Sequence, residues 1–172
     1  MLKLAPIIID LSITSDWKRK GFLDKVFTEN EKHIINQSID PTITVWQFWS
    51  MKEAAYKALC RNSNAVFNPL LFFCSADRLV QYNGQSILTN TIIDGDIIHT
   101  IATTSQNVTT YLNDNTLDYI NKFNLANLDI ELKKDANGLP VILDKVTGET
   151  HIASISHHNR FLGVVYNKKP CS

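Results

Sequence analysis

The chain has 172 residues, 44% of them hydrophobic, which is enough for one compact domain with a substantial core. Lys plus Arg and Asp plus Glu number 17 each, so no net charge favours nucleic acid or a membrane as a partner, and neither is expected. Three widely spaced cysteines argue against a disulfide framework or a zinc ribbon. Without a recognisable signal peptide or membrane-spanning run, a cytoplasmic location is expected.

The first part of the chain predicts one strand followed by three helices. Pro6–Leu11 is a β-branched apolar run, typical of a buried strand. Asp16–Val26 alternates basic and apolar residues and predicts a short basic amphipathic helix, interrupted near Gly21. Thr28–Glu31 has the pattern of a capping box that starts a second helix. Asp40-Pro41 combines an N-cap with a first-turn proline and opens a long helix.

The second part predicts antiparallel strands around one further helix. The first group of predicted strands is Leu70–Cys74, Arg78–Tyr82, Gln85–Leu88 and Ile97–Ala102. A helix is predicted from about Thr116 to Phe123, and the strands after it are Leu128–Leu132, Pro140–Leu143, His151–Ile155 and Phe161–Tyr166. We therefore expect an α+β fold, a single domain over residues 1–172 with two pseudo-similar lobes of helix plus antiparallel strands. The first lobe covers about 1–112 and the second about 113–172.

The long helix carries a group of charged residues within Trp49–Lys57. Glu53 and Lys57 are one turn apart on one stripe of the helix, with Lys52 beside them. A carboxylate can bind a hard divalent cation, and a lysine one turn away can bind the phosphates that the cation bridges. The same spacing also fits an ordinary surface pair of Glu and Lys, worth about 0.2–0.5 kcal/mol.

A second carboxylate, Asp10, ends the first predicted strand. An acid after such an apolar run is costly to bury without a partner or a metal. In one interpretation, Asp10 and Glu53 form a sparse oxygen site that suits magnesium better than zinc. In the other, Asp10 only caps the next turn through Ser12 or Thr14.

The third group of polar residues is Ser154–Arg160, near the end of the chain. Strand alternation places Ser154, Ser156 and His158 on one face, with His157 near the following turn. Ser156 and His157 can both donate hydrogen bonds to a phosphate. A Ser/His hydrolase is a rival interpretation, although the glycines of a nucleophile elbow are missing. Surface histidines at a hairpin turn are the simplest alternative.

Together these segments resemble the 4'-phosphopantetheinyl transferases, which move phosphopantetheine from coenzyme A to a serine of a carrier protein. Pro6–Leu11 resembles the family's G-[IV]-D-[IL] strand, and Phe48–Lys57 resembles its W-[ST]-x-K-E-[AS]-x-x-K helix. Ser154–His157 is similar to the S-x-S-H strand, and Gly138–Pro140 to the G-[KR]-P turn. The helix motif is the most specific of the four.

The resemblance implies roles for the residues of the first lobe. Asp10 and Glu53 would bind Mg²⁺ on the diphosphate of coenzyme A, which is a substrate, and Lys57 would contact the phosphates. Glu53 is also placed to take the proton of the carrier serine as its hydroxyl attacks the β-phosphate. Lys52 is carried over either as a phosphate contact or as a surface charge.

In the second lobe, the resemblance implies that Ser156 and His157 hold phosphate, and that Gly138 and Pro140 shape the adenine pocket. No counterpart of the basic segment that larger members use for the 3'-phosphate is found in the sequence.

The expected partner is an acyl or peptidyl carrier protein, which is typically acidic. The predicted basic helix offers a docking surface, in which two aromatic residues would act as apolar anchors: Trp17, Lys18, Arg19, Phe22 and Lys25. A solvated helix face without a partner is the alternative.

The order of the motifs, with the aspartate first and S-x-S-H last, is that of the short holo-acyl-carrier-protein synthases, whose trimers bind coenzyme A between subunits. Two lobes in one chain predict a self-contained monomer, with a homo-trimer as the alternative. Ile8 stands where the family has glycine, and Ser12 where larger members have an acid. These departures keep a second function open: a weak or inactive transferase-like protein that binds coenzyme A or a carrier in a biosynthetic assembly.

Overall fold

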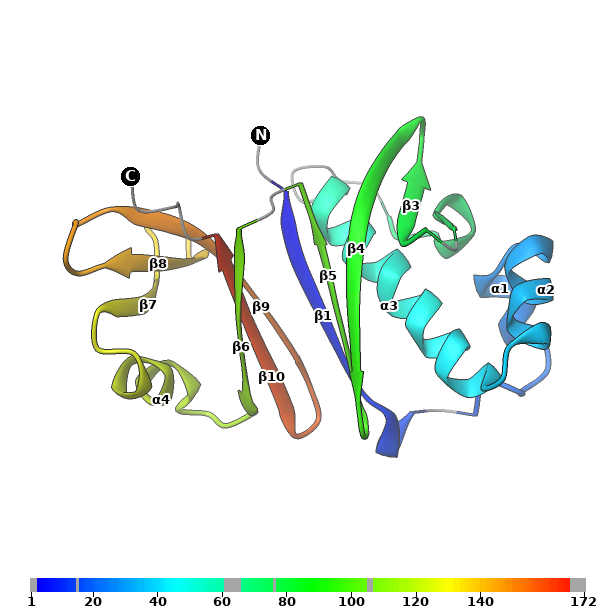
Figure 1. The fold of residues 1–172 in the computed structure, drawn as a ribbon, viewed down its shortest axis with the longest axis horizontal. Helices are drawn as coiled ribbons and strands as arrows, with labels where there is room; N and C mark the ends of the chain where they lie inside the picture. Colours follow the sequence, from blue (N-terminus) through cyan, green and yellow to red (C-terminus); the bar gives the residue numbers. More distant parts are fainter. Residues whose placement is uncertain (1–2, 15, 61–65, 76, 105–106, 168–172) are drawn as a thin grey trace.

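The computed structural model describes residues 3–14, 16–60, 66–75, 77–104 and 107–167, and it contains two antiparallel five-stranded sheets (Figure 1). The first sheet has the strand order β1 (Leu4–Asp10), β5 (Ile97–Thr103), β4 (Gln85–Asp94), β3 (Leu79–Tyr82) and β2 (Phe73–Cys74). The second has the order β6 (Val108–Asp114), β10 (Phe161–Asn167), β9 (Thr150–His158), β8 (Pro140–Asp144) and β7 (Ile130–Lys134). The predicted α+β class, with two similar lobes, is confirmed.

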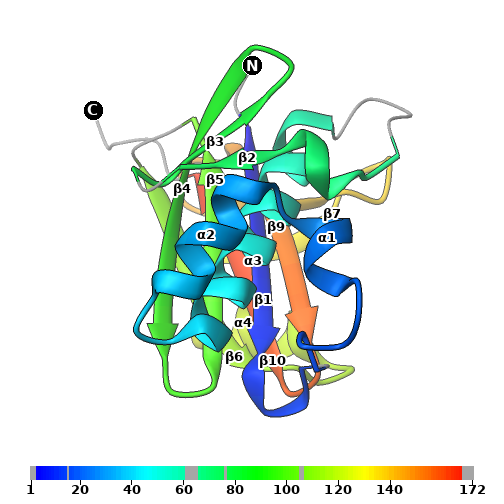
Figure 2. The ribbon, with the colours of Figure 1, turned by 90° about the vertical axis from the view of Figure 1, so that its right-hand side faces the viewer.

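Helices cover the outer faces of both sheets (Figures 1 and 2). The longest, α3 (Pro41–Cys60), packs on the first sheet, and α1 (Phe22–Val26) and α2 (Glu29–Gln37) lie beyond it. On the second sheet the outer helix is α4 (Tyr119–Ala126), and two short 3-10 turns are η1 (Leu11–Ile13) and η2 (Pro69–Leu71). Within the described ranges, no helix combines the length and apolar character needed to cross a membrane.

Two helices start at the predicted caps. Thr28 and Glu31 form the reciprocal capping box of α2, and the Asp40 side chain accepts a hydrogen bond from the N–H of Ile43 at the start of α3. The basic helix predicted over Asp16–Val26 is wrong in its first half, but the predicted interruption near Gly21 is present, and the regular helix α1 begins after it. Gly21 has φ +78°, a left-handed conformation that ends any helix arriving from the N-terminal side.

The predicted strands are present, with three main differences. Of the predicted strand Leu70–Cys74, only Phe73–Cys74 is a strand, β2, because Pro69–Leu71 forms the 3-10 turn η2. β4 runs six residues beyond the predicted end at Leu88, because it pairs with β5 as far as Asp94 opposite Ile97. β6 was not predicted, since its sequence is largely polar and its strand conformation depends on pairing with β10. β6 belongs to the second sheet, so the change of sheet lies between β5 and β6 and the expected lobe boundary near residue 112 falls inside β6.

The two lobes meet where the outer edge of β1 faces β9. The backbone N–H of Ile8 donates to Ser156 Oγ at 3.0 Å, and the N–H of Asp10 donates to His158 Nδ1 at 2.9 Å. Pro6, two residues before Ile8 on the same edge, has no N–H to satisfy. The edge of β1 is therefore satisfied by side chains of the other lobe rather than by a further strand.

A buried histidine lies beside this contact. His99 on β5 is fully buried, and neither of its ring nitrogens has a hydrogen-bond partner in the described part of the chain. A Cβ placed on Gly163 of β10 would come within 3.2 Å of His99 Nε2, so a larger residue there would crowd the ring. Burial lowers the pKa of His99 to about 4, which keeps the ring neutral between the lobes at neutral pH.

The neutral His99 predicts a pH dependence of stability. Since the pKa is depressed in the folded state, the unfolded chain binds the extra proton first, and stability falls as the pH drops from 6.5 towards 4. The full shift corresponds to about 3 kcal/mol in the free energy of unfolding. Urea unfolding of the wild type and His99→Leu at pH 7, 5.5 and 4.5 measures it. The stability difference between wild type and variant should change with pH in favour of the variant, and a constant difference would contradict the assignment.

Candidate active site

Two adjoining cavities lie in the cleft between the lobes, and Lys57 and His157 line both of them. The tyrosine cavity, of about 510 Å³, is lined among others by Tyr119, Lys134 and Pro140. The tryptophan cavity, of about 430 Å³, is lined among others by Trp46, Trp49 and Glu53. The cleft therefore has two different chambers with one cationic junction.

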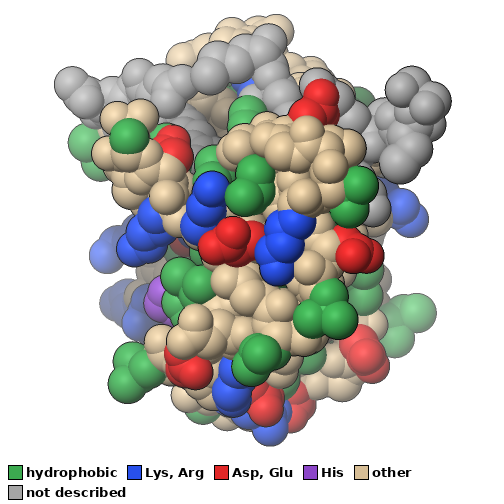
Figure 3. Space-filling view, turned by 90° about the vertical axis from the view of Figure 1, so that its left-hand side faces the viewer, with side chains coloured by type: hydrophobic (Ala, Val, Ile, Leu, Met, Phe, Trp, Pro, Cys, Tyr) green, Lys and Arg blue, Asp and Glu red, His purple; other side chains and the backbone are tan. Residues whose placement is uncertain are grey.

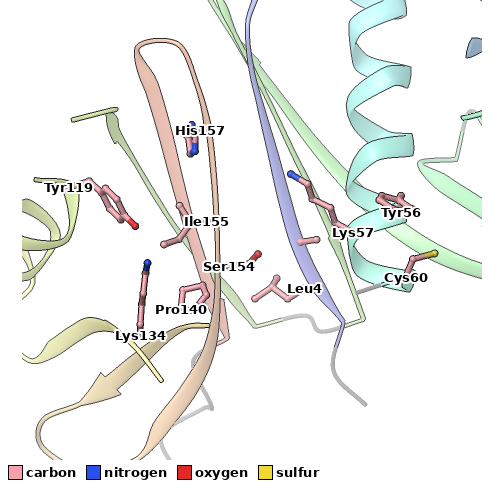
Figure 4. A pocket seen from close by; sticks show the side chains of 11 residues that line it. Leu4, Tyr56, Lys57, Cys60, Tyr119, Lys134, Pro140, Ser154, Ile155 and His157 are labelled. Carbon is pink, nitrogen blue, oxygen red and sulfur yellow. The ribbon is translucent and has the colours of Figure 1, made fainter. Parts of the chain in front are cut away.

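The tyrosine cavity is built from both lobes (Figure 4). Lys57 extends from α3 on one side, and Tyr119, Lys134 and Pro140 lie on the other. Tyr119 is the first residue of α4, Lys134 the last of β7 and Pro140 the first of β8, so three element ends converge here. Two ammonium groups and an aromatic ring can bind a phosphorylated ligand that also carries a flat base.

The tryptophan cavity combines an apolar wall with one carboxylate. Glu53 is half-buried on α3, and its neighbours in the lining include Ile9, Phe22 and Trp49. Ser156 and His157 of β9 form part of the opposite side. A carboxylate in such surroundings can accept a proton from a hydroxyl group brought into the chamber.

The structure brings together five of the predicted site residues, which all line the cleft: Glu53, Lys57, Pro140, Ser156 and His157. Ser156 is buried, and its hydroxyl already accepts the N–H of Ile8. Gly138 does not line either cavity. It adopts φ +77° in the turn between β7 and β8, and this turn leads into Pro140.

The prediction for Lys52, either a phosphate contact or a surface charge, is wrong, because the residue is buried inside the first lobe. Its side chain is fully buried, and Nζ binds Glu31 Oε2 at 2.7 Å and the carbonyl oxygens of Val26 and Pro69 at 2.9 and 3.0 Å. The physical reason is the helical phase: neighbours on a helix differ by about 100°, so Lys52 points into the lobe while Glu53 faces the cleft.

Asp10 is also placed differently from the expected metal ligand. It is buried at the end of β1 and does not line either cavity. Its Oδ1 accepts hydrogen bonds from the N–H and hydroxyl of Ser12, and its Oδ2 accepts from Asn159 Nδ2 and Arg160 Nε. The capping interpretation through Ser12 is therefore the one that the structure shows.

These contacts also determine the charge of Asp10. Burial tends to raise the pKa of its carboxyl group, but hydrogen bonds from Ser12 and Asn159, together with the charge of Arg160, outweigh burial and lower the pKa to about 2. The group is thus a carboxylate at neutral pH, and its oxygens are already occupied by donors.

An Mg²⁺ ion shared by Asp10 and Glu53 does not fit this arrangement. A carboxylate offers about four acceptor positions, and all four of Asp10 are taken. Of the two predicted ligands, only Glu53 lines the cleft.

The predicted docking surface keeps its cations but loses its apolar anchors. Phe22 is buried and packs against Trp46, and Trp17 is half-buried with Nε1 donating to Thr42 Oγ1 at 3.1 Å. Both aromatic residues belong to the first lobe's core. The remaining residues of the prediction are exposed: Lys18, Arg19 and Lys25.

Sequence reasoning missed Tyr119 and Lys134. Lys134 is on the same strand face as the buried Leu132, which predicts that it points towards α4, but not that a cavity lies there. Tyr119 lies within the predicted helix and has no motif around it. Their joint position depends on how the second lobe packs against the first.

Comparison with known proteins agrees with the motifs. The family model of the 4'-phosphopantetheinyl transferase superfamily matches residues 8–115, and the chain belongs to this superfamily. The matched part contains Asp10, Glu53 and Lys57 and ends before β7. No curated protein sequence matches the chain.

Among solved structures, the chain is similar to the crystal structure of Thermotoga maritima holo-[acyl-carrier-protein] synthase. The two are 12% identical with a TM-score of 0.45, and the match covers 81% of this chain and 86% of that chain.

The buried position of Lys52 predicts a large loss of stability on its removal. Lys52→Ala would leave the Glu31 carboxylate buried without its cation, and should lower the free energy of unfolding by about 3–5 kcal/mol. Lys57→Ala, on the same helix but exposed, is the matched control and should change it by no more than about 0.5 kcal/mol. Urea unfolding at pH 7 measures both. Equal, small effects would contradict the buried pair.

Proposed function

We propose that this protein transfers the 4'-phosphopantetheine group of coenzyme A to a serine of an acyl or peptidyl carrier protein. The observation that carries the proposal is the shared junction of the two cavities, where Lys57 of one lobe and His157 of the other line both chambers. Membership of the superfamily supports phosphopantetheinyl transfer as the general reaction.

In the proposed complex, the nucleotide of coenzyme A occupies the tyrosine cavity. The ring of Tyr119 and the side chain of Pro140 would pack against the base, and Lys134 would bind a phosphate of the nucleotide. The diphosphate would lie at the junction, within reach of Lys57 and His157. The pantetheine arm would then leave the junction away from the tyrosine cavity.

The carrier serine would enter through the tryptophan cavity, where Glu53 is the carboxylate. The serine oxygen attacks the β-phosphorus of coenzyme A, and its proton passes to Glu53. The bond from this phosphorus to the bridging oxygen breaks, and adenosine 3',5'-bisphosphate leaves with the bond's electron pair. Lys57 stabilises the negative charge that develops on the departing phosphate.

Magnesium dependence is an expectation from the family resemblance. Because Asp10 has no acceptor position left, no step of the proposed mechanism depends on a metal bound by Asp10 and Glu53 together. We place the reaction in the cytoplasm, a reducing compartment that keeps the buried Cys74 as a thiol.

The proposed docking surface for an acidic carrier is the exposed basic group Lys18, Arg19 and Lys25 in the first lobe. Arg19 also lines the tryptophan cavity, so a carrier bound here would present its serine near Glu53. Figure 3 shows the opposite end of the molecule, where both basic and acidic side chains are exposed.

A second candidate function is binding of coenzyme A or a carrier without transfer. The four hydrogen bonds to the Asp10 carboxylate favour this alternative, because the family resemblance implies a metal ligand at this position and these donors occupy its oxygens.

Mass spectrometry of apo-carrier proteins incubated with coenzyme A, Mg²⁺ and the protein tests the proposal. We expect the mass of one phosphopantetheine on the carrier serine. Glu53→Gln and Lys57→Ala should each lower kcat by about 10²–10³-fold, because one removes the base and the other a cation at the reacting phosphate. Lys122→Ala, an exposed lysine outside both cavities, is the control and should react as the wild type does.

Calorimetric titration with coenzyme A separates the two candidate functions. Binding of coenzyme A with no added mass on several carriers would favour the binding protein. No binding of coenzyme A would contradict the transferase and leave only the binding of a carrier as the alternative.

A further inference from the structure

The carboxylate of Asp10 accepts four hydrogen bonds, which come from both lobes. Two of its four hydrogen bonds come from Ser12 in its own lobe, at Oδ1, and two come from Asn159 and Arg160 in the other lobe, at Oδ2. The cross-lobe distances are 2.8 Å from Asn159 Nδ2 and 3.2 Å from Arg160 Nε. A cation at either oxygen would have to displace one of these donors.

The contacts of Asp10 reach three consecutive residues of the second lobe. Asn159 and Arg160 form the turn of the β9–β10 hairpin, and the backbone N–H of Asp10 donates to Nδ1 of the preceding residue, His158. The guanidinium group of Arg160 also binds a second acid of the first lobe. Its Nη2 atom lies 2.7 Å from Oδ2 of Asp96, in the turn between β4 and β5. The hairpin turn is therefore bound to the first lobe at two acidic side chains.

Burial explains why these contacts matter for the fold. Asp10 is fully buried, and a buried carboxylate is tolerated only with its charge and its acceptor positions satisfied. The hydrogen bonds that Asp10 accepts across the boundary come from the turn after β9, the strand that carries Ser156 and His157. Losing the carboxylate would leave Arg160 without one of its two acidic partners and release the turn.

We propose that Asp10 joins the two lobes through Asn159 and Arg160 and is not a ligand of any divalent cation bound in the cleft. The metal part of this inference rests on the proposed function, whereas the joining of the lobes does not. A metal that accompanies coenzyme A would find Glu53 as the carboxylate that lines the cleft.

Two measurements on the full-length chain test the proposal: the thermal unfolding midpoint, and the affinity for Mn²⁺ in the presence of coenzyme A, followed by electron paramagnetic resonance. Asp10→Asn should lower the Tm by roughly 5 °C or more and change the Mn²⁺ affinity by less than about twofold. Glu53→Gln is the matched control and should show the reverse, a Tm within about 2 °C of the wild type and a loss of at least about tenfold in Mn²⁺ affinity. A loss of Mn²⁺ affinity in Asp10→Asn, or an unchanged Tm, would overturn the proposal.

Arg160→Gln keeps the test decisive if Asp10→Asn does not fold. The proposal predicts a lower Tm and unchanged Mn²⁺ affinity for this variant. If Asp10 were instead a metal ligand, removal of the competing guanidinium would tighten Mn²⁺ binding. A wild type that binds coenzyme A but no Mn²⁺ would remove the metal from the proposed function, and the Tm values would still decide whether Asp10 joins the lobes.

Discussion

The arrangement of the two lobes depends on how the backbone N–H groups at the outer edge of β1 are hydrogen-bonded. A strand at the edge of a sheet has backbone N–H groups that must find acceptors, and here they find Ser156 and His158 on β9 instead of another strand. Because these acceptors are side chains, β9 can run beside β1 without merging the two sheets into one. The space that remains beside this contact is the cleft, and Lys57 and His157 reach it from opposite lobes.

Two buried carboxylates hold the parts of this arrangement in place. Glu31 binds Lys52 inside the first lobe, and Asp10 binds Arg160 across the lobe boundary. In both cases the pair includes a charged side chain, Lys52 or Asp10, from the part of the chain that the superfamily model matches. Each of these side chains is buried, lines neither cavity and stabilises the fold. The charged and polar residues that line the cleft therefore lie on the exposed face of α3, with Glu53 and Lys57, and on β9, with Ser156 and His157.

The sequence predicts local structure well where one short segment contains the whole signal. The caps at Thr28 and Asp40 define the starts of α2 and α3, and the glycine turns at Asn83-Gly84 and Gly95 define hairpins of the first sheet. The strand β6 was missed because its polar sequence acquires a strand conformation only by pairing with β10, over fifty residues later in most of its contacts. The motif residues Glu53, Lys57 and His157 were predicted to act together, and they line one cleft.

The sequence offered the contact of Asp10 with Ser12 as one interpretation, but not the cross-lobe contacts of Asp10 or the burial of Lys52, because these depend on donors or acceptors far along the chain. The partners of Asp10 across the boundary are about 150 residues away, and no spacing rule connects them. Lys134 and Tyr119 likewise become neighbours of Lys57 only through the contact between β1 and β9. Local sequence patterns thus determine which helices and strands form, and packing between the lobes determines which charged side chains line the cleft.

If both lobes of one chain form a single coenzyme site, coenzyme A should contact both lobes at once. A titration of the ¹⁵N-labelled protein with coenzyme A, followed by amide chemical shifts, distinguishes this arrangement from binding to one lobe. We expect amides around Lys57 on α3 and around Lys134 and His157 in the second lobe to shift together, with the same dissociation constant. Shifts confined to one lobe would contradict this arrangement.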